Sequence, residues 1–153
     1  MELKKYQLQV IKDLDRFLEL LIEKQNISKA YNALWNEKGI NVGIDGMPPY
    51  NPELAGVPTG GGKTFLAANS LKPIFASMPH IHPKAVVWLV PSDAILSQTY
   101  KTLTDKNHAY RKKIDVDIGN KVEVYSKQQL LNGQNFNPTS VGDNLSIFVL
   151  SYD

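Results

Sequence analysis

Apolar residues in the first part of the chain recur at helical spacing. Between Tyr6 and Trp35 they fall every three or four positions, and Lys, Asp and Glu occupy the places between them. This pattern predicts an amphipathic helix with one buried face. Asn26-Ile27-Ser28 interrupts the pattern, and Asn26 or Ser28 can cap a second helical segment. From Gly39 to Pro52 the chain carries three Gly and three Pro, which predicts a loop.

Short apolar runs in the rest of the chain predict buried strands. Each run is too short for a helix and is rich in Val, Ile, Leu or aromatic residues; the runs are Leu54–Val57, Ala85–Val90, Val122–Tyr125 and Leu145–Leu150. Between them lie predicted helices at Lys63–Ser77, Ser92–Asp105 and Ser126–Leu131, and Asn132–Asn144 is predicted to be a surface loop. The alternation indicates an α/β fold with a mostly parallel sheet and right-handed crossovers.

Composition narrows the class of protein without naming a function. The 153 residues suit one domain, and the formal net charge of +2 permits nucleic-acid binding without indicating it. The absence of Cys excludes disulfides, Cys-ligated metal sites and a thiol nucleophile. No apolar run reaches the length of a membrane span, and the N-terminus does not resemble a signal peptide, so we expect a cytoplasmic protein with no membrane partner.

A glycine-rich turn between a predicted strand and a predicted helix is the strongest candidate site. The strand Leu54–Val57 leads into Pro58-Thr59-Gly60-Gly61-Gly62, and Lys63-Thr64 opens the helix. Glycines let the backbone N–H groups approach a polyphosphate closely, and the helix N-terminus adds unpaired N–H groups. A Lys at this place can reach the β- and γ-phosphates, and the neighbouring hydroxyl can bind Mg²⁺. The pattern departs from the general phosphate loop at Val57, where that loop has Gly.

These residues resemble motif I of superfamily 2 DEAD/DEAH-like helicases, in which the first position is a small apolar residue. Two other segments agree: Leu3-Lys4-Lys5-Tyr6-Gln7 resembles the upstream Tyr-Gln element, and the segment 85–98 resembles motif Ia. Within the superfamily the chain is most similar to the motor (Res) subunit of type III restriction enzymes. The resemblance implies a RecA-like P-loop NTPase fold, a three-layer sandwich with a mostly parallel sheet.

The resemblance also implies roles for particular residues. ATP would be bound by Tyr6, Gln7, Pro58, Thr59, Gly60, Gly61, Gly62, Lys63 and Thr64, with Gln7 reading adenine, Lys63 as the catalytic cation and Thr64 as the Mg²⁺ ligand. Motif Ia would contact nucleic acid, expected to be DNA, through Pro91, Ser92 and Gln98. The implied function is that of an ATP-dependent DNA helicase or translocase that belongs to a restriction-modification system. A methyltransferase subunit is the implied partner, and an endonuclease activity would accompany the motor.

The sequence lacks parts that ATP hydrolysis requires. No Asp-Glu pair follows a strand, and Ser151 and Tyr152 separate Asp153 from the apolar run before it, so we expect the metal-binding acid elsewhere. We therefore expect the first half of motor domain 1, inactive alone, with residues 1–52 as a helical segment and residues 53–153 as a partial ATP-binding domain. Two alternatives remain: another P-loop NTPase such as a kinase, and a non-catalytic nucleotide-binding interaction domain.

A basic cluster between Lys106 and Lys113 leaves two interpretations open. It combines His108, Arg111 and further lysines with Tyr110. Such a cluster can contact a phosphate backbone, or it can be a solvated helix end.

Overall fold

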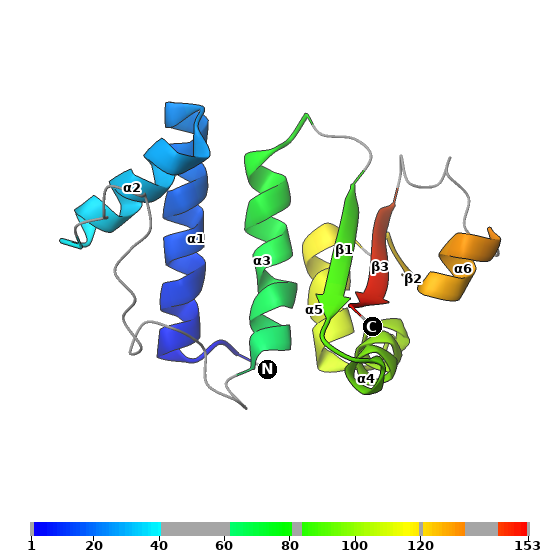
Figure 1. Ribbon diagram of the computed structural model, residues 1–153. Coiled ribbons are helices and arrows are strands. Elements are labelled where there is room, and N and C mark those ends of the chain that lie inside the picture. The colour runs from blue at the N-terminus through cyan, green and yellow to red at the C-terminus, as the bar shows by residue number, and fades with distance from the viewer. Residues whose placement is uncertain (1, 41–61, 81–83, 120, 134–143, 153) are drawn as a thin grey trace. The chain divides into compact units, whose positions relative to one another are not determined.

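The computed structural model describes residues 2–40, 62–80, 84–119, 121–133 and 144–152 (Figure 1). The chain divides into two compact units, Met1–Ser77 and Met78–Asp153, which we describe separately. The predicted strand Leu54–Val57 and the predicted boundary between residues 52 and 53 lie outside the described residues, so both stay predictions.

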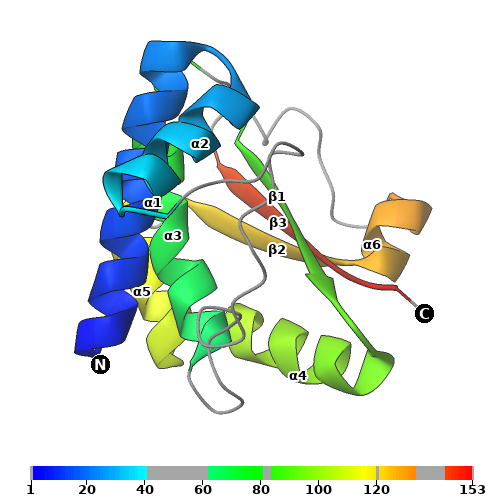
Figure 2. The same ribbon diagram turned by 60° about the vertical axis from the view of Figure 1, so that its left-hand side comes forward.

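The described residues of the N-terminal unit form three helices, α1 (Lys5–Lys24), α2 (Ile27–Glu37) and α3 (Lys63–Ser77). The predicted break between the first two is confirmed, and Asn26 is the cap, because its Oδ1 accepts a hydrogen bond from the Lys29 N–H at 3.0 Å. Gln25 is the C-cap of α1 and adopts the left-handed conformation, with φ of 51°. The two helices form a hairpin (Figure 2) around a small apolar core of Leu20, Ala30 and Leu34.

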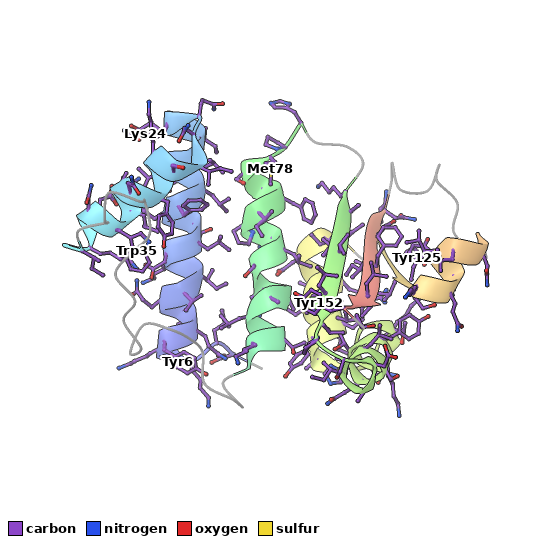
Figure 3. All side chains as sticks on the ribbon, viewed as in Figure 1. Tyr6, Lys24, Trp35, Met78, Tyr125 and Tyr152 are labelled. Carbon is purple, nitrogen blue, oxygen red and sulfur yellow. The ribbon has the colours of Figure 1, made fainter. Side chains whose placement is uncertain are left out.

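Charged side chains also join α1 to the end of α2. Arg16 donates through Nε and Nη2 to the two carboxylate oxygens of Glu37, at 2.9 and 2.6 Å, and through Nη1 to Glu19. The hydrogen bond from Arg16 lowers the pKa of Glu37 below its ordinary value. Lys38 pairs with Asp13 beside this contact, and its ammonium group lies over the ring of Trp35, a residue of α2 (Figure 3). These pairs are exposed, so they set the geometry of the hairpin more than its stability.

In the part of the C-terminal unit that the structure describes, three strands form a parallel sheet. Its strands are β1 (Ala85–Val90), β2 (Val122–Ser126) and β3 (Leu145–Ser151), in the order β1-β3-β2. This confirms the predicted α/β class and the three predicted strands that the structure describes. The central strand carries Ile147 and Val149, both fully buried, and Phe148 stacks on Tyr125 of β2 with ring centroids 5.5 Å apart. A central strand buried on this scale is typical of a parallel sheet.

Helices α4 (Asp93–Thr104), α5 (Ala109–Ile118) and α6 (Lys127–Asn132) connect these strands. Figure 2 shows α4 beginning beyond the carboxyl end of β1. The sequence predicts α4 and α6 to within a residue or two at each end, but it does not predict α5. Its N-cap is His108, whose Nδ1 accepts a hydrogen bond from the Tyr110 N–H at 3.2 Å, and its C-cap is Gly119, with φ of 87°.

Helix α5 accounts for most of the basic cluster between Lys106 and Lys113. Arg111 is 5% exposed and donates to Asp115 Oδ1 at 2.8 Å and to the carbonyl oxygens of Leu103 and Val122 at 2.9 and 2.7 Å. Lys113 pairs with Asp117 at 2.7 Å. The cluster is therefore partly internal: Arg111 ties the end of α4, helix α5 and the start of β2 together.

Candidate nucleotide site and carboxyl-end pocket

The start of α3 has the features expected of the end of a phosphate loop. Gly62 has φ of +77°, in the left-handed region that a residue with a side chain adopts only with strain. Lys63 and Thr64 are the first two residues of α3, Lys63 is exposed, and no acidic residue lies in the first turn. The predicted binding residues Pro58, Thr59, Gly60 and Gly61 lie outside the described residues. The described part therefore presents a cation, a hydroxyl and helix N–H groups together.

Gln7, far upstream in the sequence, lies against this turn. A Cβ built on Gly62 would stand 2.7 Å from the Gln7 Nε2 atom, closer than real Cβ atoms approach a neighbour. Gln7 is only 4% exposed, so its amide is enclosed where the first turn of α1 meets the residue before α3. Tyr6, also in the first turn of α1 (Figure 3), is 40% exposed. Two segments that the sequence predicts to share a site are thus in contact at Gln7 and Gly62.

The other end of the Gln7 amide is held by the beginning of its own helix. Its Oε1 accepts a hydrogen bond from the Lys4 N–H at 2.9 Å, as part of a capping box at the N-terminus of α1. In a capping box the side chain at the third helical position satisfies an N–H group that the helix leaves unpaired. The amide orientation of Gln7 is therefore set by the backbone.

The residues present fit a nucleoside triphosphate. A bulkier residue at position 62 would fill the space where the turn and Gln7 meet, and a triphosphate bound at this helix start would face Lys63 and the exposed N–H groups of α3. Thr64 supplies one oxygen of the kind that Mg²⁺ prefers. In the described ranges no group of three or more His, Asp or Glu residues lies close enough together to hold a metal ion.

A separate pocket lies at the carboxyl ends of the strands in the C-terminal unit. Its volume is about 410 Å³, and its lining comes from the start of α4, from the β2–α6 junction and from the end of β3: Asp93, Leu96, Ser97, Ser126, Lys127, Gln128 and Ser151. The Ser151 hydroxyl donates to Asp93 Oδ1 at 2.8 Å, which joins the end of β3 to the start of α4. Ligands of open parallel sheets bind at the carboxyl ends of the strands. The residues that directly follow each predicted strand could therefore have been chosen from the sequence as candidate binding residues.

The predicted motif Ia residues lie beside this pocket in the chain but do not line it. Pro91 and Gln98 are exposed, and Ser92 is half-buried at the N-cap of α4, where its side chain makes no capping hydrogen bond. Lys127 is exposed and Ser126 caps α6, accepting a hydrogen bond from the Gln129 N–H at 3.3 Å. The pocket therefore offers three serine hydroxyls, one ammonium group and one carboxylate.

Comparison with known proteins identifies the family. A family model described as "Type III restriction enzyme, res subunit" matches residues 1–152, nearly the whole chain. No curated protein and no solved structure matches the chain. Among the described helices none is both long and apolar enough to cross a membrane. The resemblance drawn from motifs I and Ia is confirmed by the match. The chain thus belongs to the family of type III restriction enzyme res subunits, whose RecA-like domain is an ATP-binding helicase or translocase motor.

Proposed function

We propose that this chain is the ATP-binding part of a DNA translocase motor in a type III restriction-modification system. The observation that carries the proposal is the contact between the Gln7 amide and Gly62, directly before Lys63 at the start of α3. It brings a group able to recognise a base within reach of groups able to hold phosphates. The family match supports the same assignment.

Each residue at this site has a distinct role in the proposal. Lys63 neutralises negative charge on the γ-phosphate as it develops, and the N–H groups of Gly60, Gly61 and Gly62 bind phosphate oxygens. Gln7 donates to and accepts from adenine through its amide. Thr64 holds Mg²⁺, which when bound offsets phosphate charge. Because no Asp-Glu pair follows a strand in the sequence, we expect the chain to bind ATP and to hydrolyse it poorly.

The carboxyl-end pocket supplies the nucleic-acid face in this proposal. Lys127 and the hydroxyls of Ser97 and Ser126 are suited to phosphate oxygens, which accept hydrogen bonds from such groups without regard to base sequence. Asp93 would repel a phosphate, but the hydrogen bond from Ser151 and the charge of Lys127 oppose that effect. Pro91, Ser92 and Gln98 extend the face along motif Ia. A DNA-modifying methyltransferase subunit is the proposed partner of the whole motor, which we expect to act inside the cell.

Nucleotide titration of purified variants tests the ATP site. Lys63→Ala removes a charge-assisted contact, so we expect ATP affinity to fall by roughly 10- to 100-fold in isothermal titration calorimetry with Mg²⁺ present. Lys72→Ala is the matched control, because Lys72 is an exposed lysine on the same helix. Equal ATP affinities for the two variants would overturn the assignment of Lys63.

Salt dependence tests the DNA face. Lys127→Ala should reduce the magnitude of the slope of log K against log salt by about 0.7 for single-stranded DNA, because one phosphate contact is lost. Lys121→Ala, an exposed lysine outside the pocket lining, should leave the slope unchanged. If both variants bind DNA like the unmodified chain, the pocket is not the nucleic-acid face.

A further inference from the structure

We infer that Tyr100 of α4 positions Lys127 in the wall of the carboxyl-end pocket, because its hydroxyl holds the side chain of Gln129 at the start of α6. The inference rests on the proposed function, in which Lys127 contacts a phosphate of single-stranded DNA. Tyr100 and Gln129 are not among the residues that line the pocket. Their role is therefore to position Lys127 and not to contact the nucleic acid.

The first step concerns the turn that carries Lys127. This lysine follows Ser126, the last residue of β2, and is the first residue of α6. The Ser126 N–H donates to Gln129 Oε1 at 2.9 Å, and the Gln129 N–H donates to Ser126 Oγ at 3.3 Å. This capping box joins the residues on either side of Lys127. The backbone position of Lys127 therefore depends on the side chain of Gln129.

The second step is that α6 needs support from other elements. The helix has six residues, fewer than a helix needs to be stable by itself in water, and none of these residues is buried. Gln129 is half-buried. Hydrogen bonds that reach α6 from the rest of the unit therefore decide where its first turn lies.

The third step is the support that comes from α4. The Tyr100 hydroxyl lies 3.1 Å from Gln129 Oε1, and the two residues are 29 positions apart in the sequence. The Ser126 N–H can only donate, so the oxygen end of the Gln129 amide faces it, and the Tyr100 hydroxyl is then a donor to the same oxygen. An amide oxygen has two lone pairs, so it accepts both hydrogen bonds at once. Tyr100 thus ties the capping box of α6 to α4.

The face of α4 that lines the pocket also carries Tyr100. Asp93, Leu96 and Ser97 are lining residues, and Tyr100 lies one helical turn after Ser97. Residues one turn apart are neighbours on the surface of a helix. The hydrogen bond from Tyr100 therefore sets the separation between the α4 wall of the pocket and the wall that carries Lys127.

The consequence concerns the ammonium group of Lys127. Lys127 is exposed on a long, flexible side chain, so its backbone is the part that the protein can position in advance. Without the bond from Tyr100, the wall that carries Lys127 has to be ordered when a phosphate binds. Ordering one flexible side chain on binding lowers affinity by about 2- to 10-fold. We expect the loss of the Tyr100 hydroxyl to weaken DNA binding by this factor.

The test measures binding of a fluorescein-labelled single-stranded oligothymidine by fluorescence anisotropy over a range of salt concentrations. Tyr100→Phe removes the hydroxyl and keeps the ring, and we expect it to weaken binding by about 2- to 10-fold. It should also reduce the magnitude of the slope of log K against log salt, by at most the value of about 0.7 expected for Lys127→Ala. Tyr31→Phe is the matched control, because Tyr31 is a half-buried tyrosine of α2 outside the pocket lining, and it should change neither quantity.

Two double variants separate positioning from general damage to the unit. In a Lys127→Ala background, Tyr100→Phe should no longer weaken binding, because the group that it positions is gone. In a Gln129→Met background, which keeps the length of the side chain but lacks the acceptor, Tyr100→Phe should also have no further effect. A purely structural role of Tyr100 would weaken binding in every background. The Lys127→Ala comparison decides the matter if Gln129→Met does not fold.

The outcomes distinguish this inference from the proposed function. If Lys127→Ala weakens binding but Tyr100→Phe binds DNA like the unmodified chain, the inference is overturned and the DNA face stands. Equal weakening by Tyr100→Phe with and without Lys127 overturns the inference too. If Lys127→Ala binds as tightly as the unmodified chain, or if the unmodified chain does not bind the oligonucleotide, the proposed DNA face fails and the inference fails with it.

Discussion

Replacing Gly62 by alanine combines two separate costs. The φ of +77° would cost an alanine about 1–2 kcal/mol. The new Cβ would also stand 2.7 Å from Gln7 Nε2, so the buried amide has to move. Movement breaks its hydrogen bond with the Lys4 N–H, which contributes about 0.5–1.5 kcal/mol. We therefore expect Gly62→Ala to lower the free energy of unfolding by about 1.5–3.5 kcal/mol.

Gly39→Ala is the matched control for backbone strain alone. Gly39 has φ of +73°, but nothing lies within 4 Å of the place where its Cβ would be. Urea denaturation followed by far-UV circular dichroism should therefore show a loss of only about 1–2 kcal/mol for this variant. In a Gln7→Ala background the cost of Gly62→Ala should fall to the same value. Equal losses for Gly62→Ala and Gly39→Ala in the unmodified background would refute the contact between Gln7 and the phosphate-loop turn.

Two other substitutions test the ion pairs of each unit. Arg111→Ala leaves Asp115 and two carbonyl groups without their buried donor, so we expect the free energy of unfolding, measured by urea denaturation, to fall by about 3–5 kcal/mol. The control Lys112→Ala removes an exposed lysine of the same helix and should change the free energy of unfolding by less than about 0.5 kcal/mol. Similar losses for the two would show that Arg111 does not hold α5. The hydrogen bond from Arg16 lowers the pKa of Glu37 in the folded chain. The ion pair therefore stabilises the fold fully at pH values above the pKa of Glu37 in the unfolded chain, about 4.3, and this stabilisation is lost as the pH falls through the pKa of Glu37 in the folded chain. Glu37→Gln should therefore reduce the decline in thermal stability at acid pH, and an unchanged decline would contradict this role.

The sequence predicts best those elements that have clear boundary residues and a single periodic spacing of apolar residues. Helix α3 and strand β1 have the predicted ends, because a glycine run precedes the first and short polar connections bound the second. The strand order β1-β3-β2 could not be predicted, since right-handed crossovers leave several orders of a parallel sheet open.

Helix α5 shows where the periodic signal fails. Its apolar positions do not form one buried stripe, because Ile114 is fully buried while Val116 is 77% exposed. The helix depends on Arg111, whose buried guanidinium replaces part of the apolar face that a pattern search expects. From sequence alone a basic residue is expected to be exposed, so the packing of the Arg111 side chain inside the unit could not be predicted.

The sequence predicts residues for a nucleotide site, and those residues stay a prediction; it does not predict the contacts that the structure shows around Gln7. Lys63 and Thr64 follow from the order of strand, glycines and helix, whereas Gln7 was assigned only by resemblance. The sequence gives no sign that the Gln7 amide touches Gly62 or that its oxygen is taken by Lys4. The contact with Gly62 joins segments far apart in the chain and depends on how α1 packs against α3, whereas the hydrogen bond with Lys4 is local to the first turn of α1.

The position of β3 has a consequence for synthesis of the protein. It pairs with β1 on one side and β2 on the other, although it is the last of the three to leave the ribosome. Until Leu145–Ser151 emerges, β1 and β2 lack the strand that pairs with both. Unpaired apolar strands of this kind aggregate readily. The nascent chain therefore passes through an interval in which chaperone binding would protect it, and insertion of β3 ends that interval.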